Sequence, residues 1–197
     1  MLLKMATKKV IDVSGWQEGI DYDAVVNAGV QGVIIKISES LSPEKTFEWH
    51  YNKCIEKGLD WGVYCYSHAV DADMSTAEAN EVLYLLKGRK PTMGVWFDFE
   101  DQKCLNSYDP TQVCSGFIVY MNRNNIYSGV YASLSTFSSG IVNPKALADY
   151  VPYWVAQYAS RCDFKDYYPD NVLAGWQYSG SSYIGNTEVD MNEWYID

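Results

Sequence analysis

The segment Val95-Trp96-Phe97-Asp98-Phe99-Glu100 decides the fold of this 197-residue chain. Side chains alternate between the two faces of a β-strand, so Trp96, Asp98 and Glu100 share one face and the other face is apolar. The apolar face suits packing against helices. The acidic face suits the inside of a closed barrel, with both acids near the C-terminal end of the strand, where barrel enzymes carry their chemistry. The alternative is an edge strand with a solvated acidic face.

Outward from this segment, runs rich in β-branched and aromatic residues alternate with helical stretches, which is typical of βα units. The predicted strands of this part cover residues 9–13, 32–37, 61–66, 93–100 and 127–132. The predicted helices cover residues 23–28, 46–57, 75–87 and 110–124, with a short piece near 144–150 after a serine-rich loop. Ser75 and Glu78 match a capping box at the start of the third helix.

The last third of the chain has no helical periodicity of useful length. Three further strands are predicted there, at residues 153–158, 172–178 and 188–192, joined by loops. Eight strands, of which the last three lack helices, predict a single α/β domain related to the (β/α)₈ barrel that has lost its final helices. An open doubly wound sheet is the runner-up, but no strand is followed by a phosphate-binding glycine loop.

The charge and aromatic content narrow the classes of ligand. The chain has 15 basic and 25 acidic residues, a net charge of −10, which argues against nucleic acid and anionic lipid as partners. Aromatic residues make up 15% of the chain, and exposed rings often stack on the apolar faces of sugars. No apolar run is long enough to span a membrane, and the N-terminus lacks the pattern of a signal peptide.

Cysteine and histidine are too few or too irregular for the usual metal sites. The five cysteines show no paired spacing, and with two histidines a site built on several histidines is impossible. We therefore expect no metal and no cofactor. A hydrolase with an all-carboxylate metal site stays an alternative, and it would lose activity on chelation.

Four acids are the candidate catalytic residues. Asp12 ends the first predicted strand and Asp190 lies in the last, and these two strands become neighbours when a barrel closes. If Asp12, Asp98, Glu100 and Asp190 all point inward, like-charge crowding raises the pKa of at least one carboxyl. One carboxyl then stays protonated while another is ionised, the division of labour found in glycoside hydrolysis. Capping or loop roles are equally good interpretations of Asp12 and Asp190 taken singly.

The ordered set of short motifs resembles glycoside hydrolase family 25, the Chalaropsis-type lysozymes. The matching segments of the first half are residues 11–17 (IDVSGWQ), 20–22 (IDY), 35–39 (IKISE), 62–64 (GVY) and 97–100 (FDFE). Those of the second half are residues 130–131 (VY), 153–158 (YWVAQY), 176–179 (WQYS) and 189–192 (VDMN). A departure is Cys65, which stands where many relatives have histidine.

The resemblance implies a flattened, TIM-like (β/α)₅(β)₃ barrel over residues 9–197, with residues 1–8 as an extension. It implies cleavage of the β-1,4 bond between N-acetylmuramic acid and N-acetylglucosamine in peptidoglycan. Glu100 resembles the general acid, and Asp98 the partner that assists attack by the substrate's acetamido group, with Asp12 and Asp190 in support. A nucleophilic Asp98 and an inverting route stay open. The expected substrate-binding residues are Tyr64, Tyr131, Trp154, Gln157, Tyr158, Trp176 and Gln177.

Two further expectations concern the biological setting. Without a signal peptide, we expect synthesis in the cytoplasm of a bacterial cell, phage-infected or not, and action on the cell wall after release. The chain is either a catalytic fragment of a longer lysin with a wall-binding domain or complete as it stands. A non-catalytic glycan-binding barrel and a glucosaminidase on the same scaffold are the alternative functions.

Overall fold

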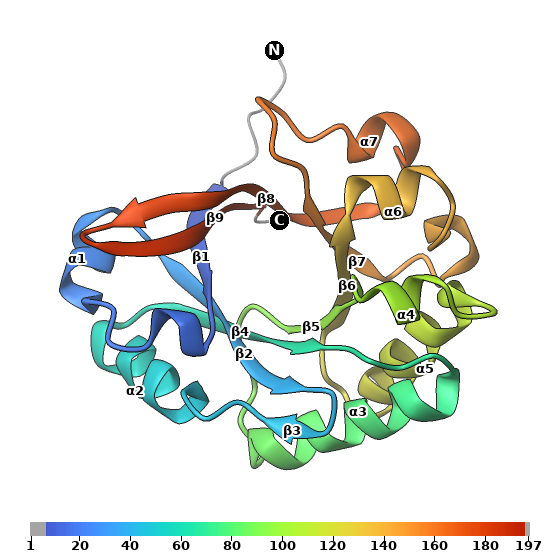
Figure 1. Ribbon diagram of the computed structural model, residues 1–197, viewed down its shortest axis with the longest axis horizontal. Helices are drawn as coiled ribbons and strands as arrows, with labels where there is room; N and C mark the ends of the chain where they lie inside the picture. Colours follow the sequence, from blue (N-terminus) through green and yellow to red (C-terminus); the bar gives the residue numbers. More distant parts are fainter. Residues whose placement is uncertain (1–6, 196–197) are drawn as a thin grey trace.

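A closed barrel of eight strands forms the centre of the computed structural model, which describes residues 7–195 (Figure 1). Its strands are β1 (Thr7–Val13), β2 (Gly32–Glu39), β4 (Asp60–Tyr66), β5 (Val95–Asp98), β6 (Ser128–Ser133), β7 (Pro152–Ala156), β8 (Val172–Ile184) and β9 (Thr187–Tyr195). Their order is β1-β9-β8-β7-β6-β5-β4-β2, and pairing of β1 with β2 closes the ring. The short β3 (Ser42–Pro43) pairs with β2 outside it. The prediction of a closed barrel is confirmed.

Strand direction changes only at the last strand of the barrel. From β2 round to β8, and between β1 and β2, neighbouring strands are parallel. β9 runs antiparallel to both β8 and β1. This hairpin needs no crossover helix, because antiparallel strands can be joined by a tight turn. The hairpin also makes both strands longer than predicted.

The helices follow the early strands. The longer ones are α1 (Tyr22–Asn27), α2 (Phe47–Lys57), α3 (Ala72–Leu86) and α5 (Pro110–Arg123). The short ones are η1 (Gly15–Gln17), α4 (Gln102–Leu105), α6 (Leu134–Ser138), η2 (Pro144–Ala146) and α7 (Phe164–Tyr167). In Figure 1, α2, α3 and α5 lie outside the lower side of the ring, and the β8–β9 hairpin forms much of its upper side. The predicted loss of helices from the last strands is confirmed, although short α7 lies between β7 and β8.

Three local predictions were wrong. Helix α3 begins after Asp71, whose side chain accepts a hydrogen bond from the backbone N–H of Met74, so Ser75 is not its cap. The serine-rich loop contains α6, because the hydroxyl of Ser133 caps that helix through the N–H of Thr136. The piece expected near 144–150 is a single 3-10 turn over 144–146.

The barrel wall separates an outer core from an inner one. Outside, Phe97 stacks on Phe117 of α5 with ring centres 4.4 Å apart, as the alternation along 95–100 predicts. Inside, Trp96 meets Trp194 edge-on at 5.1 Å and Trp154 at 6.2 Å. Gly129 makes room for this layer, because a Cβ there would overlap the Trp96 ring and the Pro152 carbonyl. The tryptophan layer fills the barrel beneath the acidic residues.

The domain prediction concerns the N-terminus. Residues 1–6 of the expected extension lie outside the described residues, and Thr7 and Lys8 already belong to β1. Among the described residues, no helix is both long and apolar enough to cross a membrane.

Candidate active site

One cavity of about 210 Å³ lies at the C-terminal ends of the parallel strands. Every strand of the barrel contributes a side chain to it: Asp12, Lys36, Tyr64, Tyr66, Asp98, Tyr131, Trp154, Gln177 and Asp190, with Ser14, Trp16 and Glu100 from the adjoining loops. The structure therefore brings all four candidate acids to one place. Asp12, Asp98 and Asp190 point inward by the alternation of β1, β5 and β9, and Glu100 lies just beyond the end of β5.

Asp12 and Asp190 lie directly opposite each other in the antiparallel pairing of β1 and β9. Asp12 is buried, and its Oδ2 accepts hydrogen bonds from Asn192 Nδ2 at 2.8 Å and Gln177 Nε2 at 3.1 Å. Burial and the charge of Asp190 raise the pKa of Asp12, more than these two hydrogen bonds lower it. Burial also raises the pKa of Asp190. The pair thus holds a proton more readily than isolated carboxyls do.

Gln177 connects the acid pair to the aromatic residues of the cavity. Its Nε2 donates to Asp12, and its Oε1 accepts from the hydroxyls of Tyr131 at 2.9 Å and Tyr158 at 3.1 Å. On the other side of the pair, Trp154 Nε1 donates to Asn192 Oδ1 at 2.8 Å. These contacts fix the orientation of both amides, so each presents N–H groups to Asp12.

Asp98 is the most buried of the four candidate acids, and one of its oxygens has no hydrogen-bond partner among the described residues. The residue is 5% exposed, and the oxygen without a partner is the buried Oδ1. Burial, then the charges of Glu100 and Asp12, raise its pKa, and Lys36 opposes this shift. A buried carboxyl oxygen without a partner is costly unless a ligand supplies a donor.

Glu100 lies at the mouth of the cavity, just beyond the end of β5. Its side chain is open to solvent but is surrounded by the concave rim, and this partial desolvation raises its pKa. The charge of Asp190 raises it further. Glu100 is therefore the acid that combines access to a bound ligand with a pKa shifted toward the protonated form.

Lys36 was missed by the sequence reasoning. Its Nζ lies 2.8 Å from Glu39 Oε2 and 5.3 Å from the ring centre of Tyr66, and its side chain lines the cavity. Alternation along 32–37 carried the signal, because Lys36 follows Ile34 on the face that points into the barrel. Ser14 and Trp16 were also missed, since they lie in the turn after β1 rather than on a strand.

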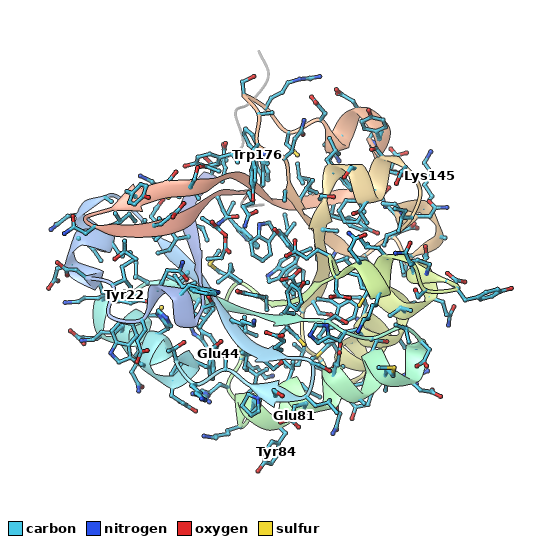
Figure 2. All side chains as sticks on the ribbon, viewed as in Figure 1. Tyr22, Glu44, Glu81, Tyr84, Lys145 and Trp176 are labelled. Atoms are coloured by element: carbon cyan, nitrogen blue, oxygen red, sulfur yellow. The ribbon has the colours of Figure 1, made fainter. Side chains whose placement is uncertain are left out.

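The predicted substrate-binding residues divide into two groups. Tyr64, Tyr131, Trp154 and Gln177 line the cavity, and Tyr158 reaches its edge through the hydroxyl that binds Gln177. Trp176 and Gln157 do not line it. The indole of Trp176, labelled in Figure 2, borders a separate hollow on the outside of the barrel, and its Nε1 donates to the Gln157 carbonyl. The Gln157 side chain binds Asp163 instead.

The reason for this division is strand geometry. Trp176 and Gln177 are neighbours on β8, so their side chains point to opposite faces of the strand, and Gln177 points to the inner one.

Within residues 7–195, no group of three or more histidine, cysteine or carboxylate side chains is arranged to hold a metal ion.

Sequence comparison decides the family. The family model "Glycosyl hydrolases family 25" matches residues 11–187. The chain belongs to this family. It is also 25% identical over 188 residues to an autolytic lysozyme of Clostridium acetobutylicum, in a match that covers 92% of this chain and 55% of that protein.

Solved structures share the fold of this family 25 barrel. The modular autolysin LytC of Streptococcus pneumoniae superimposes with a TM-score of 0.83 at 23% identity, over 96% of this chain and 47% of that one. A lysozyme of Streptomyces coelicolor superimposes with a TM-score of 0.77 at 22% identity, over 97% and 93% of the two chains. The present chain thus spans about half the length of the autolytic lysozyme and of LytC.

Proposed function

We propose that this chain is a muramidase that hydrolyses the β-1,4 bond between N-acetylmuramic acid and N-acetylglucosamine in peptidoglycan. The observation that carries the proposal is a pair of acids at the end of β5. Glu100 lies at the cavity mouth just beyond the strand, and Asp98 is a buried carboxyl whose Oδ1 has no partner within residues 7–195. Family membership and the likeness to an autolytic lysozyme support the choice of substrate. One LytC structure is a complex with a synthetic peptidoglycan ligand, which supports peptidoglycan as the ligand of this chain.

Glu100 acts as the general acid in this mechanism. Its raised pKa keeps a larger fraction of the carboxyl protonated near neutral pH, and its position at the mouth lets it reach the oxygen of the scissile bond. Proton transfer to that oxygen accompanies breakage of the bond to C1, so the leaving sugar departs as a neutral alcohol.

Asp98 assists the substrate's own acetamido group. The free Oδ1 accepts the acetamido N–H, which turns the acetamido carbonyl oxygen toward C1 as the nucleophile. The N–H donor also favours the ionised form of Asp98, against the burial that raises its pKa in the free protein. The ionised carboxyl then stabilises the positive charge that develops on the cyclised acetamido group.

The second step returns the enzyme to its starting state. Glu100, now ionised, takes a proton from a water molecule that attacks C1, and the ring formed by the acetamido group opens. Two displacements at C1 give retention of configuration. Asp190 supports this cycle from the opposite wall, because its charge raises the pKa of Glu100. Asp12 lies beside Asp190 and is held there by hydrogen bonds from Gln177 and Asn192.

The sugar at the new reducing end tests the proposal. Purified bacterial walls are digested, reduced with borohydride and hydrolysed, and the sugar alcohols are separated. We expect muramitol from the wild-type protein and at least about a hundredfold less from Glu100→Gln. Glucosaminitol would indicate a glucosaminidase, and the absence of both alcohols with retained wall binding would indicate a glycan-binding barrel. A chelator in the digest should change nothing, whereas loss of activity would favour a carboxylate-metal hydrolase.

The site of action follows from the substrate. We propose that the protein is made in the cytoplasm of a bacterial cell, phage-infected or not, and reaches the wall after release. The net charge of −10 disfavours adhesion to an anionic wall through the barrel surface alone. A wall-binding domain on a longer form of the protein would supply that adhesion.

A further inference from the structure

Trp16 is an exposed ring at the edge of the cavity that the mechanism above does not use. All seven tryptophans lie among the described residues, and Trp16 is the one that is exposed, with 92% of its surface open. It nevertheless lines the cavity that contains the four acids. Burial of a large apolar side chain is favourable, so packing does not explain why this ring is left in water.

The backbone that carries Trp16 is held in place at several points. The hydroxyl of Ser14 accepts a hydrogen bond from the N–H of Trp16, and Gln17 Oε1 accepts one from the N–H of Ser14 at 2.9 Å. Gln17 Nε2 in turn donates to the carbonyl of Glu188 on β9 at 3.1 Å. The turn η1 is therefore tied to the barrel on both sides of the indole. A ring presented from a fixed turn loses little conformational freedom when it binds a ligand.

The size of the cavity indicates what the ring would meet. At about 210 Å³ the cavity is smaller than the roughly 300–1,000 Å³ of pockets that enclose a drug-sized ligand. It can enclose part of a glycan strand, about one sugar residue, and the neighbouring residues must then lie across the rim. The apolar face of a pyranose ring is the part of a glycan strand that suits an exposed indole at this rim.

We propose that Trp16 is a stacking platform for a sugar residue of the glycan strand next to the residue held in the cavity. The ring contributes binding energy outside the reacting bond, so it sets how tightly a long strand binds and not how fast the bond breaks. This inference rests on the proposed function for the identity of the ligand, a peptidoglycan glycan strand.

Kinetics on soluble, peptide-free glycan strands test the proposal. We expect Trp16→Ala to raise KM about three- to tenfold with kcat unchanged, because aromatic contacts of this size correspond to such factors. Trp16→Phe should recover most of the affinity. The matched control is Tyr84→Ala, which removes a 74% exposed ring from α3, at the lower edge of Figure 2. Tyr84→Ala should keep wild-type KM, and thermal unfolding should be unchanged in all three variants.

Fluorescence quenching gives a readout that does not need turnover. In Glu100→Gln protein, acrylamide should quench the exposed Trp16, and saturating glycan strands should protect it. The double variant Glu100→Gln/Trp16→Phe should lack this protected component. If wild-type protein is active and Trp16→Ala has an unchanged KM, the stacking role is wrong and the proposed function stands. If wild-type protein releases no reducing ends, the proposed function fails. In that case, protection of Trp16 from acrylamide by glycan strands still supports the stacking platform, and a lack of protection contradicts the platform.

Discussion

Asp12 on β1 and Asp190 on β9 lie directly opposite each other where these two strands pair antiparallel. The two carboxyls interact directly, and the interaction raises the pKa of Asp12 and lowers that of Asp190, although burial keeps the pKa of Asp190 above its ordinary value. Asn192 and Gln177 both donate to Asp12 Oδ2, and Gln177 Nε2 also lies 3.5 Å from Asp190 Oδ2. The fold thus places two interacting carboxyls, both with a raised pKa, on the wall opposite Glu100.

The pair should make stability depend on pH. A carboxyl whose pKa is raised by folding binds its proton more tightly in the folded state, so its stabilising effect is present below the ordinary carboxyl pKa and is lost as pH rises through the raised value. Asp12→Asn mimics the protonated form and keeps an oxygen for Asn192 and Gln177. We expect Asp12→Asn to have a higher Tm than the wild type at pH 8. Each kcal/mol gained in the free energy of unfolding raises Tm by about 2–4 °C in a chain of this size. This difference should vanish at pH 4.

Differential scanning fluorimetry from pH 4 to pH 9 measures this difference. Asp149→Asn, which removes an exposed carboxyl, controls for the change of net charge and should follow the wild-type curve. A constant Tm difference between Asp12→Asn and wild type across the range would show that Asp12 is not protonated preferentially in the folded state.

Gln177→Met should disturb the same pair by removing the amide that donates to Asp12. The substitution keeps the length of the side chain but removes the donor to Asp12 and the acceptor of the Tyr131 hydroxyl. We expect unfolding to become easier by about 1–3 kcal/mol, because the buried hydroxyl loses its partner. The pKa of Asp12 should also rise further, which a carboxyl ¹³C NMR titration follows. Exposed Gln112→Met is the control, and an unmoved Asp12 titration would contradict the contact.

Glu100→Gln removes the transferable proton and little else. We expect kcat to fall by about 10²–10⁴, the usual contribution of a general acid, with glycan binding measured by calorimetry within a few-fold of the wild type. Glu18→Gln, which alters an exposed acid that does not line the cavity, should keep full activity. Near-normal turnover in Glu100→Gln would assign the acid to another residue.

Gly129 should not tolerate substitution, because the inner core leaves no room for a side chain at this position. A Cβ there overlaps the ring of Trp96 and the carbonyl of Pro152, so Gly129→Ala should destabilise the barrel by about 1–3 kcal/mol or more. At Gly15 the new methyl group meets the flexible end of Glu44 at 3.3 Å, so Gly15→Ala is a mild comparison. Equal urea midpoints for the two variants would contradict the packing described for the tryptophan layer.

The alternation of side chains along strands accounts for most of what was predicted correctly about the barrel interior and its four acids. Residues 95–100 sort into a face packed on Phe117 and a face that holds Asp98 and Glu100, and the same rule places Asp12 and Asp190 inside. It also argues against treating Trp176 and Gln177 as members of one cavity, since adjacent strand residues face apart. Both were predicted from their motif, and the structure keeps only Gln177 at the acids.

What could not be predicted depends on side-chain contacts between different elements of the fold. The start of α3 looked like a capping box at Ser75, yet Glu78 is buried and accepts hydrogen bonds from the Ser67 hydroxyl and the N–H of His68. The position of Trp16 depends on Gln17 reaching β9. The contacts of Glu78 reach back ten and eleven residues to the loop after β4, and the contact of Gln17 joins η1 to β9, segments that meet only when the barrel closes.

Proton NMR of a digestion in progress, on a soluble fragment of peptidoglycan glycan, tests the central claim most directly. Attack by the acetamido group and then by water predicts that N-acetylmuramic acid appears at the new reducing end, first as the β anomer, before mutarotation produces the α anomer. A first signal from the α anomer would contradict assistance by Asp98, and a new reducing end of N-acetylglucosamine would contradict muramidase activity itself.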